Sequence, residues 1–165
     1  MLVIMKKTDN FSLENIDMID LELLKVLQKD AKLTTKEIAT RVNLSPTPVY
    51  ERIKRLEKEG FIEKYAAIVN AEKLGLQLTV FCNITLKEHT KEIGNKFVKD
   101  IVSIKEVVEC YNISGDYDFL LKIMVKDMKH YQSFVINDLG SVKNIGSAHS
   151  TFVIGVIKQN HAVPI

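Results

Sequence analysis

Residues 45–58 carry hydroxyl, phenol and cationic side chains at helical spacing. Thr47, Tyr50 and Lys54 fall on one side of a helix, because they follow one another at intervals of three and four residues. Hydroxyl groups form hydrogen bonds with base edges or phosphate oxygens, and an ammonium group pairs with phosphate. The start of this stretch holds few acidic residues that would repel phosphate. This face is therefore a predicted contact surface for double-stranded DNA.

Other polar residues near this face receive separate roles. We expect Arg55 and Lys58 to contact phosphate, together with Lys36 before them, although a solvated surface charge is the alternative for Lys36. Ser45 is expected to cap the helix, with a phosphate contact as a second role. Arg52 lies beside the apolar stripe, where we expect an internal ion pair rather than a DNA contact.

Capping signals mark the helices that would position these side chains. Pro46 suits the first helical position, and Gly60 suits a left-handed stop. Thr34 and Glu37 form a capping box for a preceding short helix, and Asp17 begins a first helix that ends near residue 29. Short helices joined by a tight turn predict a helix-turn-helix, whose second helix enters the DNA major groove. By spacing alone, an ordinary pair of packed helices is the alternative.

The second half of the chain changes to the spacing of β-strands. Successive segments indicate the order β-α-β-β-α-β: a strand from Val80 to Leu86, a helix around Phe97, strands at 107–114 and 117–125, a helix at 128–139 and a strand at 147–157. This order predicts a ferredoxin-like antiparallel sheet with both helices on one face. We expect a second copy of the chain to cover the other face, because that face also carries apolar residues.

The chain is thus predicted to be α+β, with a winged helix-turn-helix three-helix domain followed by a ferredoxin-like βαββαβ domain. Residues 61–69 are interpreted as a short strand that forms a wing or a connecting arm. The predicted boundaries are 1–15 for a flexible N-terminal arm, 16–62 for the helix-turn-helix domain, 63–75 for the strand and linker, and 76–165 for the effector-binding and oligomerisation domain.

Composition indicates a globular protein. The 165 residues are 46% hydrophobic and 27% charged, and a net charge of +2 is only a weak argument for nucleic acid. Cys82 and Cys110 lie in apolar runs, where we expect small buried hydrophobes rather than a disulfide. The N-terminal apolar run is too short for a signal peptide or a membrane span, which predicts a cytoplasmic, nucleoid-associated protein. No residue spacing suggests a metal site, a cofactor or a catalytic motif.

Four motifs together resemble the Lrp/AsnC (feast/famine) family of transcriptional regulators, closest to its leucine-responsive regulatory protein branch. They are LQKDA at 27–31, LSPTP at 44–48, RIKRLE at 52–57 with GFI at 60–62, and SGDYDFLLK at 114–122. The resemblance implies a C-terminal domain that dimerises and assembles further, to tetramers or octamers. It also implies an amino-acid effector held between dimers, near residues 115–118.

A site for a free amino acid needs an acceptor for the ammonium group, donors for the carboxylate and an apolar wall. Asp116 or Asp118 would supply the acceptor, backbone amides around Gly115 the donors, and Tyr117 or Tyr111 the wall. The further candidates are Asn112, Ser150 and Thr151 on the strands, and Leu139 and Gly140 from a neighbouring dimer. Without the family resemblance, residues 115–118 indicate no more than a tight turn.

Three functions compete at this point. A sequence-specific regulator, whose assembly and DNA binding respond to a small effector, leads; an architectural DNA-wrapping protein with little effector response is the alternative. Enzymes that decarboxylate haem precursors share the expected fold, but they would need clustered His and Arg. Here the four His residues are scattered and no Arg follows Arg55, which argues against an enzyme.

Overall fold

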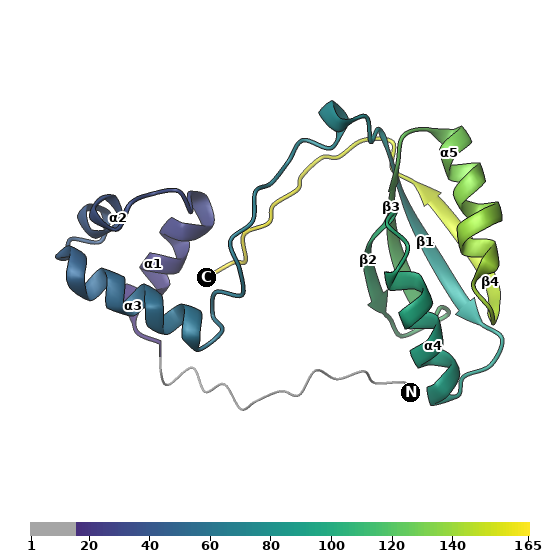
Figure 1. The fold of residues 1–165 in the computed structure, drawn as a ribbon, viewed down its shortest axis with the longest axis horizontal. Helices are drawn as coiled ribbons and strands as arrows, with labels where there is room; N and C mark the ends of the chain where they lie inside the picture. Colours follow the sequence, from purple (N-terminus) through teal and green to yellow (C-terminus); the bar gives the residue numbers. More distant parts are fainter. Residues whose placement is uncertain (1–15) are drawn as a thin grey trace. The chain divides into compact units, whose positions relative to one another are not determined.

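The computed structural model of the protein describes residues 16–165, so the predicted arm at residues 1–15 lies outside the described residues. Contacts divide the chain into two compact units (Figure 1). The helical unit contains residues 16–68 and also Lys158–Ile165, and the sheet unit contains Val69–Ile157. The last eight residues therefore group with the helices, whereas the predicted boundaries assigned them to the second domain.

The helical unit consists of α1 (Met18–Lys29), α2 (Thr35–Arg41) and α3 (Pro46–Lys58). Capping boxes begin the first two helices: Asp17 pairs with Asp20, and Thr34 with Glu37. Asn43 has a φ of 54° in the turn between α2 and α3, a left-handed conformation that asparagine tolerates. The first two helices therefore begin at residues whose side chains bond to the local backbone, and the sequence predicted the Thr34–Glu37 pair among them.

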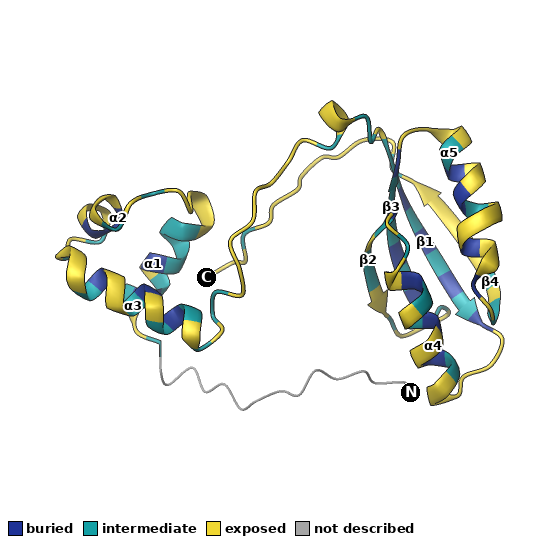
Figure 2. Cartoon of the chain, viewed as in Figure 1, coloured by how far each residue is buried: buried dark blue, intermediate teal, exposed yellow. Residues whose placement is uncertain are grey.

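Apolar residues from all three helices form the core of this unit, and Figure 2 colours the buried parts of the helices dark blue. Spacing of three to four residues along α3 brings its apolar face onto the other two helices, and leaves its polar face exposed. The buried members are Leu23, Ile38, Ala39, Val49, Ile53 and Leu56.

The segment after α3 corrects one prediction. Gly60 has the expected left-handed φ of 80°, but residues 61–69 form no strand in the described structure. A strand needs a partner for its backbone hydrogen bonds, and the helical unit supplies none. The segment instead begins with a bond from the Ile62 amide to the Leu56 carbonyl, at 3.2 Å, and continues as exposed irregular chain.

The sheet unit has the predicted ferredoxin-like architecture. Its strands are β1 (Leu78–Leu86), β2 (Val107–Asn112), β3 (Phe119–Val125) and β4 (Ile145–Phe152), all antiparallel, in the order β2-β3-β1-β4. Helices α4 (Lys91–Val102) and α5 (Met128–Ser133) cover one face (Figure 1). A short 3₁₀ turn, η2 (Glu72–Leu74), precedes the first strand.

The helix predicted at 128–139 is not continuous. After α5 the chain forms a π-helical segment, η3 (Phe134–Asp138), and then a 3₁₀ turn, η4 (Leu139–Ser141). At Gly140 a Cβ atom would lie only 3.0 Å from the Val135 carbonyl oxygen, so this close turn favours glycine. The altered winding brings Leu139 into the core, where it is 3% exposed.

Alternation along the strands separates a covered face from an open one. Val80, Cys82 and Ile84 of β1 are fully buried beneath the helices, whereas Phe81, between them, is half-buried on the open face. Leu120 and Met124 of β3 share the open face with Phe81. This face is therefore partly apolar, as the sequence predicted.

Both cysteines are free thiols, in agreement with the sequence. Cys82 is buried and Cys110 is half-buried, and burial raises the pKa of each thiol. Within residues 16–165, no helix combines the length and the apolar character that a bilayer span requires.

Candidate nucleic-acid interface and ligand pocket

The outward face of α3 presents the predicted polar side chains to solvent. Ser45, Thr47, Tyr50, Lys54 and Lys58 are all exposed, with Tyr50 at 53%. Lys54 Nζ lies 5.8 Å from the centre of the Tyr50 ring and 2.8 Å from a carboxylate oxygen of Glu57. The Glu57 carboxylate raises the pKa of Lys54. Lys54 is therefore held near Tyr50 as a cation on this face.

Ser45 occupies the predicted N-cap position but makes no side-chain capping bond, which corrects the expected role. A capping side chain accepts from the second or third backbone amide of the helix. The third helical residue here is Pro48, which has no N–H, and the first is Pro46. The Ser45 hydroxyl thus lies exposed at the helix start without the expected bond.

The arginines of α3 are bound to a buried carboxylate. Asp20, 0% exposed, accepts from Arg52 Nη1 at 2.8 Å and also from Arg55 Nη2. Arg52 Nη1 lies 2.6 Å from Asp17 as well, so the predicted internal ion pair of Arg52 is confirmed. The Asp20 backbone amide, followed by Arg52, holds the pKa of Asp17 below its usual value. The phosphate contact of Arg55 stays a prediction, and it would compete with Asp20.

Lys36 lies exposed on α2 and Lys58 exposed in the last turn of α3. Their predicted phosphate contacts are compatible with this exposure. The sequence did not identify Asp20 as the anchor of α3; its only signal was an acid in the first turn of α1, where a capping role is the simpler interpretation.

A cavity of about 390 Å³ lies in the sheet unit, between the β2–β3 hairpin and the start of α4. It contains four predicted effector residues: Asn112, Gly115, Tyr117 and Asp118. The sequence did not indicate the other lining residues, which come mainly from the ends of β1 and β2 and from α4: Leu86, His89, Thr90, Gly94, Ile113, Ser114 and Phe119. The strand order could have indicated them. Because β1 and β3 are neighbours in the sheet, the loop after β1 must approach the β2–β3 hairpin.

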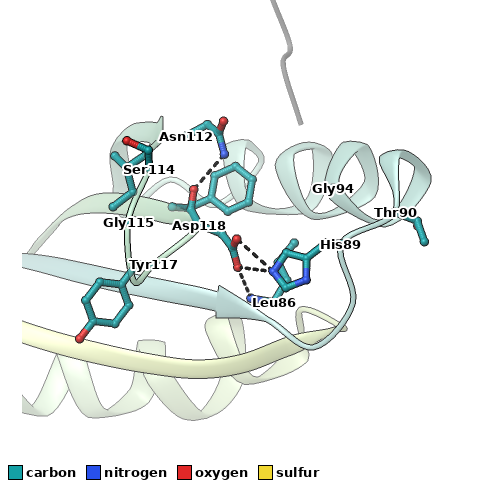
Figure 3. A pocket seen from close by; sticks show the side chains of 11 residues that line it. Leu86, His89, Thr90, Gly94, Asn112, Ser114, Gly115, Tyr117 and Asp118 are labelled. Carbon is teal, nitrogen blue, oxygen red and sulfur yellow. Dashed lines mark hydrogen bonds and ion pairs between the residues drawn. The ribbon is translucent and has the colours of Figure 1, made fainter. Parts of the chain in front are cut away.

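Asp118 is the most connected side chain of this cavity (Figure 3). Its Oδ2 accepts from the Leu86 amide at 2.7 Å and lies 3.1 Å from His89 Nε2. Its backbone carbonyl accepts from the Asn112 side chain at 2.9 Å and from the Ile113 amide at 3.0 Å. The hairpin, the end of β1 and the loop before α4 are therefore joined at a single carboxylate residue.

The hairpin turn requires the glycine that the sequence placed there. Gly115 has a φ of 117°, a conformation that other residues rarely adopt. Tyr117 points away from the His89–Asp118 pair in Figure 3, and its ring centre lies 5.5 Å from that of His149. The predicted wall therefore comes from Tyr117 only in part, and Leu86, Ile113 and Phe119 add apolar surface.

The cavity combines groups suited to a small zwitterion. Asp118 and the carbonyls of the hairpin are acceptors for an ammonium group. Thr90 caps α4 by accepting from the Ile93 amide at 3.3 Å, so the positive end of the α4 dipole is directed at this side. Backbone amides at a glycine turn and at a helix start are typical anion-binding groups.

The remaining predicted effector residues do not line this cavity. Leu139 and Gly140 border a separate cavity of about 520 Å³ in the same unit, together with two lysines, Lys87 and Lys143. Ser150 faces the helices and bonds to the Tyr131 hydroxyl.

The other three also lie outside it. Thr151 pairs with Phe81 on the open face, and the Tyr111 hydroxyl donates to Glu109 at 2.6 Å. Asp116 is exposed at the hairpin and does not line the cavity. Alternation along the strands explains the placements of Thr151 and Tyr111, because neighbouring residues of a strand point to opposite faces of the sheet.

Two family descriptions match the two units. A winged helix-turn-helix DNA-binding family matches residues 16–63, and the Lrp/AsnC ligand binding domain matches residues 79–163. Leucine-responsive regulatory proteins from Escherichia coli K12 and Klebsiella pneumoniae are each 36% identical over 152 residues, covering 92% of this chain and 93% of the relative.

Solved structures give the same assignment. A Neisseria meningitidis transcriptional regulator in complex with L-Met superposes with a TM-score of 0.87 at 32% identity, covering 90% of this chain and 96% of that one. An Agrobacterium tumefaciens AsnC family regulator also reaches 0.87 at 32% identity, covering 90% of this chain and 97% of that one.

The fold, the exposed helix and the ligand pocket together define a DNA-binding transcriptional regulator with a separate effector domain. The chain belongs to the Lrp/AsnC family, as its sequence motifs predicted. Its relatives are regulators rather than enzymes, so the enzymatic alternative is set aside.

Proposed function

We propose that this regulator reads operator DNA through α3 and changes that binding when a free amino acid occupies the cavity at Asp118. The observation that carries the proposal is the convergence of one carboxylate, a helix start and a glycine turn on a cavity of about 390 Å³. That volume lies within the range of about 300–1,000 Å³ that ligand sites occupy. The L-Met complex of the Neisseria meningitidis neighbour supports an amino acid as the ligand class.

In the proposed binding mode, Asp118 accepts from the ammonium group of the ligand. The start of α4 and the amides around Gly115 receive its carboxylate, and the apolar lining contacts its side chain. Binding in this way would tie the hairpin to the β1–α4 loop more firmly than the His89–Asp118 contact alone. If the regulator has two states that differ in DNA affinity, the ligand shifts the balance toward the state that binds the ligand more tightly. The shift is limited by the difference in ligand affinity between those two states.

Calorimetric titration with each of the twenty amino acids tests the ligand site. We expect at least one to bind, and Asp118→Asn to weaken its binding about tenfold to a hundredfold, because a charge-assisted bond is lost. Asp116→Asn is the matched control, since Asp116 is exposed and does not line the cavity. Equal loss in both variants would contradict the assignment. Binding without any change in DNA affinity would favour the architectural alternative.

On the DNA side, we propose that Thr47, Tyr50 and Lys54 lie against base edges. Ser45, Lys58 and Lys36 would contact phosphate. The operator is first selected from random DNA and then measured by fluorescence anisotropy at several salt concentrations. Lys58→Ala should reduce the slope of log affinity against log salt by about 0.9, because one phosphate contact is lost.

Two control variants distinguish phosphate contacts from base contacts of α3. Lys96→Ala removes an exposed lysine from the sheet unit, and should leave the salt slope unchanged. Thr47→Val keeps the shape of the side chain but removes its hydroxyl. It should relax the preference at particular base pairs while leaving the salt slope intact. A uniform loss across sequences would instead indicate a phosphate contact at Thr47.

We also propose that a second copy covers the open face of the sheet, and that dimers assemble further to tetramers or octamers. The half-buried Phe81, Leu120 and Met124 support this arrangement, because a partly apolar sheet face is favourably removed from water. Light scattering of the chain with Leu120→Glu should give a smaller mass than the unaltered chain. An unchanged mass would contradict the sheet-face interface. In such assemblies Leu139 and Gly140 would be supplied by a neighbouring dimer.

A further inference from the structure

The C-terminal segment, Lys158–Ile165, belongs to the helical unit although it follows the last strand of the sheet unit. The chain leaves β4 at Phe152 and ends beside α1 (Figure 1). There the Val163 amide donates to Gln28 Oε1 at 2.6 Å, and Gln28 Nε2 donates to the Val163 carbonyl at 3.4 Å. One side-chain amide thus pairs with both polar groups of one peptide residue, as a neighbouring strand would.

This pairing depends on the chemistry of glutamine. A primary amide carries a donor and an acceptor side by side, whereas carboxylates only accept and lysine only donates. Gln28 stands near the end of α1, exposed to solvent. The Ala162 amide donates to Asn160 Oδ1 at 3.0 Å, which forms a local turn just before Val163. The segment is therefore bent by its own side chain immediately before the residue that contacts α1.

Gln28 bonds to the backbone of Val163 and not to its side chain. Val163 remains 62% exposed and Ile165 remains 45% exposed, so little apolar burial accompanies it. Two hydrogen bonds to an exposed helix would not hold a free peptide at ordinary concentrations, because each contributes little net free energy. A segment tethered to the same chain has a far higher effective concentration. The chain's own C-terminal segment is therefore the favoured occupant.

We propose that Gln28 is the docking site of this segment, which gives the helix-turn-helix domain a second connection to the ligand-binding domain, completed by hydrogen bonds at Gln28. The first connection is the chain that follows α3. A domain held at two points has fewer accessible orientations than a domain held at one. The second connection makes DNA binding more responsive to changes in the effector domain. This consequence, unlike the docking itself, rests on the proposed function.

Hydrogen–deuterium exchange on the full chain, without ligand or DNA, tests the docking directly. Fragmentation of the C-terminal peptide isolates the Val163 amide. Gln28→Ala should speed exchange at Val163 about threefold to tenfold, because the docked state loses both hydrogen bonds. Alanine favours helix, so α1 should be retained. Gln132→Ala, which truncates an exposed glutamine of α5, is the matched control. Equal exchange in the unaltered chain and in Gln28→Ala would overturn the docking.

A mixing experiment distinguishes a segment of the same chain from that of a second copy. The Gln28→Ala chain is assembled with an excess of a chain that ends at Lys158 and keeps Gln28. Val163 should remain unprotected in this mixture, because its own chain lacks the docking residue. Restored protection would place the segment on a second copy and overturn the second connection.

The regulatory consequence has its own measurement. The chain ending at Lys158 should bind amino acid and DNA with unchanged affinity when each is tested alone. The change in DNA affinity that the amino acid produces should become smaller. An unchanged response would overturn this consequence, whereas loss of amino-acid binding itself would instead count against the proposed function.

Discussion

Replacing Asp20 by alanine tests how α3 is held in the helical unit. The Asp20 carboxylate is 0% exposed and accepts from guanidinium groups of Arg52 and Arg55. It also accepts from the Asp17 amide at 3.1 Å, which closes the capping box of α1. One side chain thus joins the start of α1 to the middle of the helix that we expect to enter DNA.

The expected loss follows from these contacts. Removing one partner of a fully buried ion pair costs about 3–5 kcal/mol. The side chains of Arg52 and Arg55 are 26% and 41% exposed, so water can solvate them after the mutation and the cost moves to the lower end. Loss of the capping bond adds up to about 1 kcal/mol. We therefore expect Asp20→Ala to destabilise the helical unit by about 3 kcal/mol.

Native-state hydrogen exchange at the amides of α3 measures this free energy in the intact chain, separately from the sheet unit. Glu22→Ala is the control, because Glu22 is an exposed carboxylate of the same helix that pairs with Lys25 at 2.8 Å. Its removal should cost at most about 0.5 kcal/mol. If Asp20→Ala lowered the unfolding free energy no more than Glu22→Ala does, the central role of the buried carboxylate would be refuted.

Three further predictions concern pH, thiol access and the hairpin. The bonds from Thr34 lower the pKa of Glu37, so this stabilisation is present above the ordinary carboxyl pKa and is lost as the pH falls through the folded value. The melting temperature of the helical unit should therefore decrease when the pH is lowered below about 4. The decrease should be smaller in Glu37→Gln, which has no carboxyl group to protonate at this position. Cys82, 0% exposed with a raised pKa, should react with iodoacetamide only after unfolding, as mass spectrometry would show. Gly115→Ala should strain the hairpin by about 1–3 kcal/mol and weaken amino-acid binding in calorimetry, whereas Gly155→Ala, in open space, should not.

Local features of the fold could be predicted from sequence because each depends on neighbouring residues. The Thr34–Glu37 capping box, the Gly60 stop and the left-handed Gly115 all involve atoms within a few positions. Alternation along β1 likewise predicted which residues would be buried. The strand at 61–69 failed for the complementary reason, since a strand depends on a partner that its own sequence does not specify.

Contacts between distant segments could not be obtained in this way. His89 and Thr90 join the cavity only because β1 lies next to β3 in the sheet. The burial of Asp20 depends on the angle at which α1 meets α3, which periodicity does not fix. The division of Asn112 and Tyr111 between the cavity and the outer surface follows from the exact pairing of β2 with β3. A shift of one residue would have reversed it.

The proline pair at the start of α3 has an entropic consequence for recognition. Pro46 and Pro48 fix their own φ angles in the unfolded chain as well as in the folded one. Each therefore reduces the conformational freedom lost on folding, by about 0.4–1 kcal/mol where the native geometry fits. Thr47 lies between them and Tyr50 lies two residues after Pro48, so the face proposed to meet base edges is already ordered in the free protein. Binding free energy at this end of the helix is then not lost in ordering the backbone. The proline rings order the DNA-facing side of α3 before DNA binds.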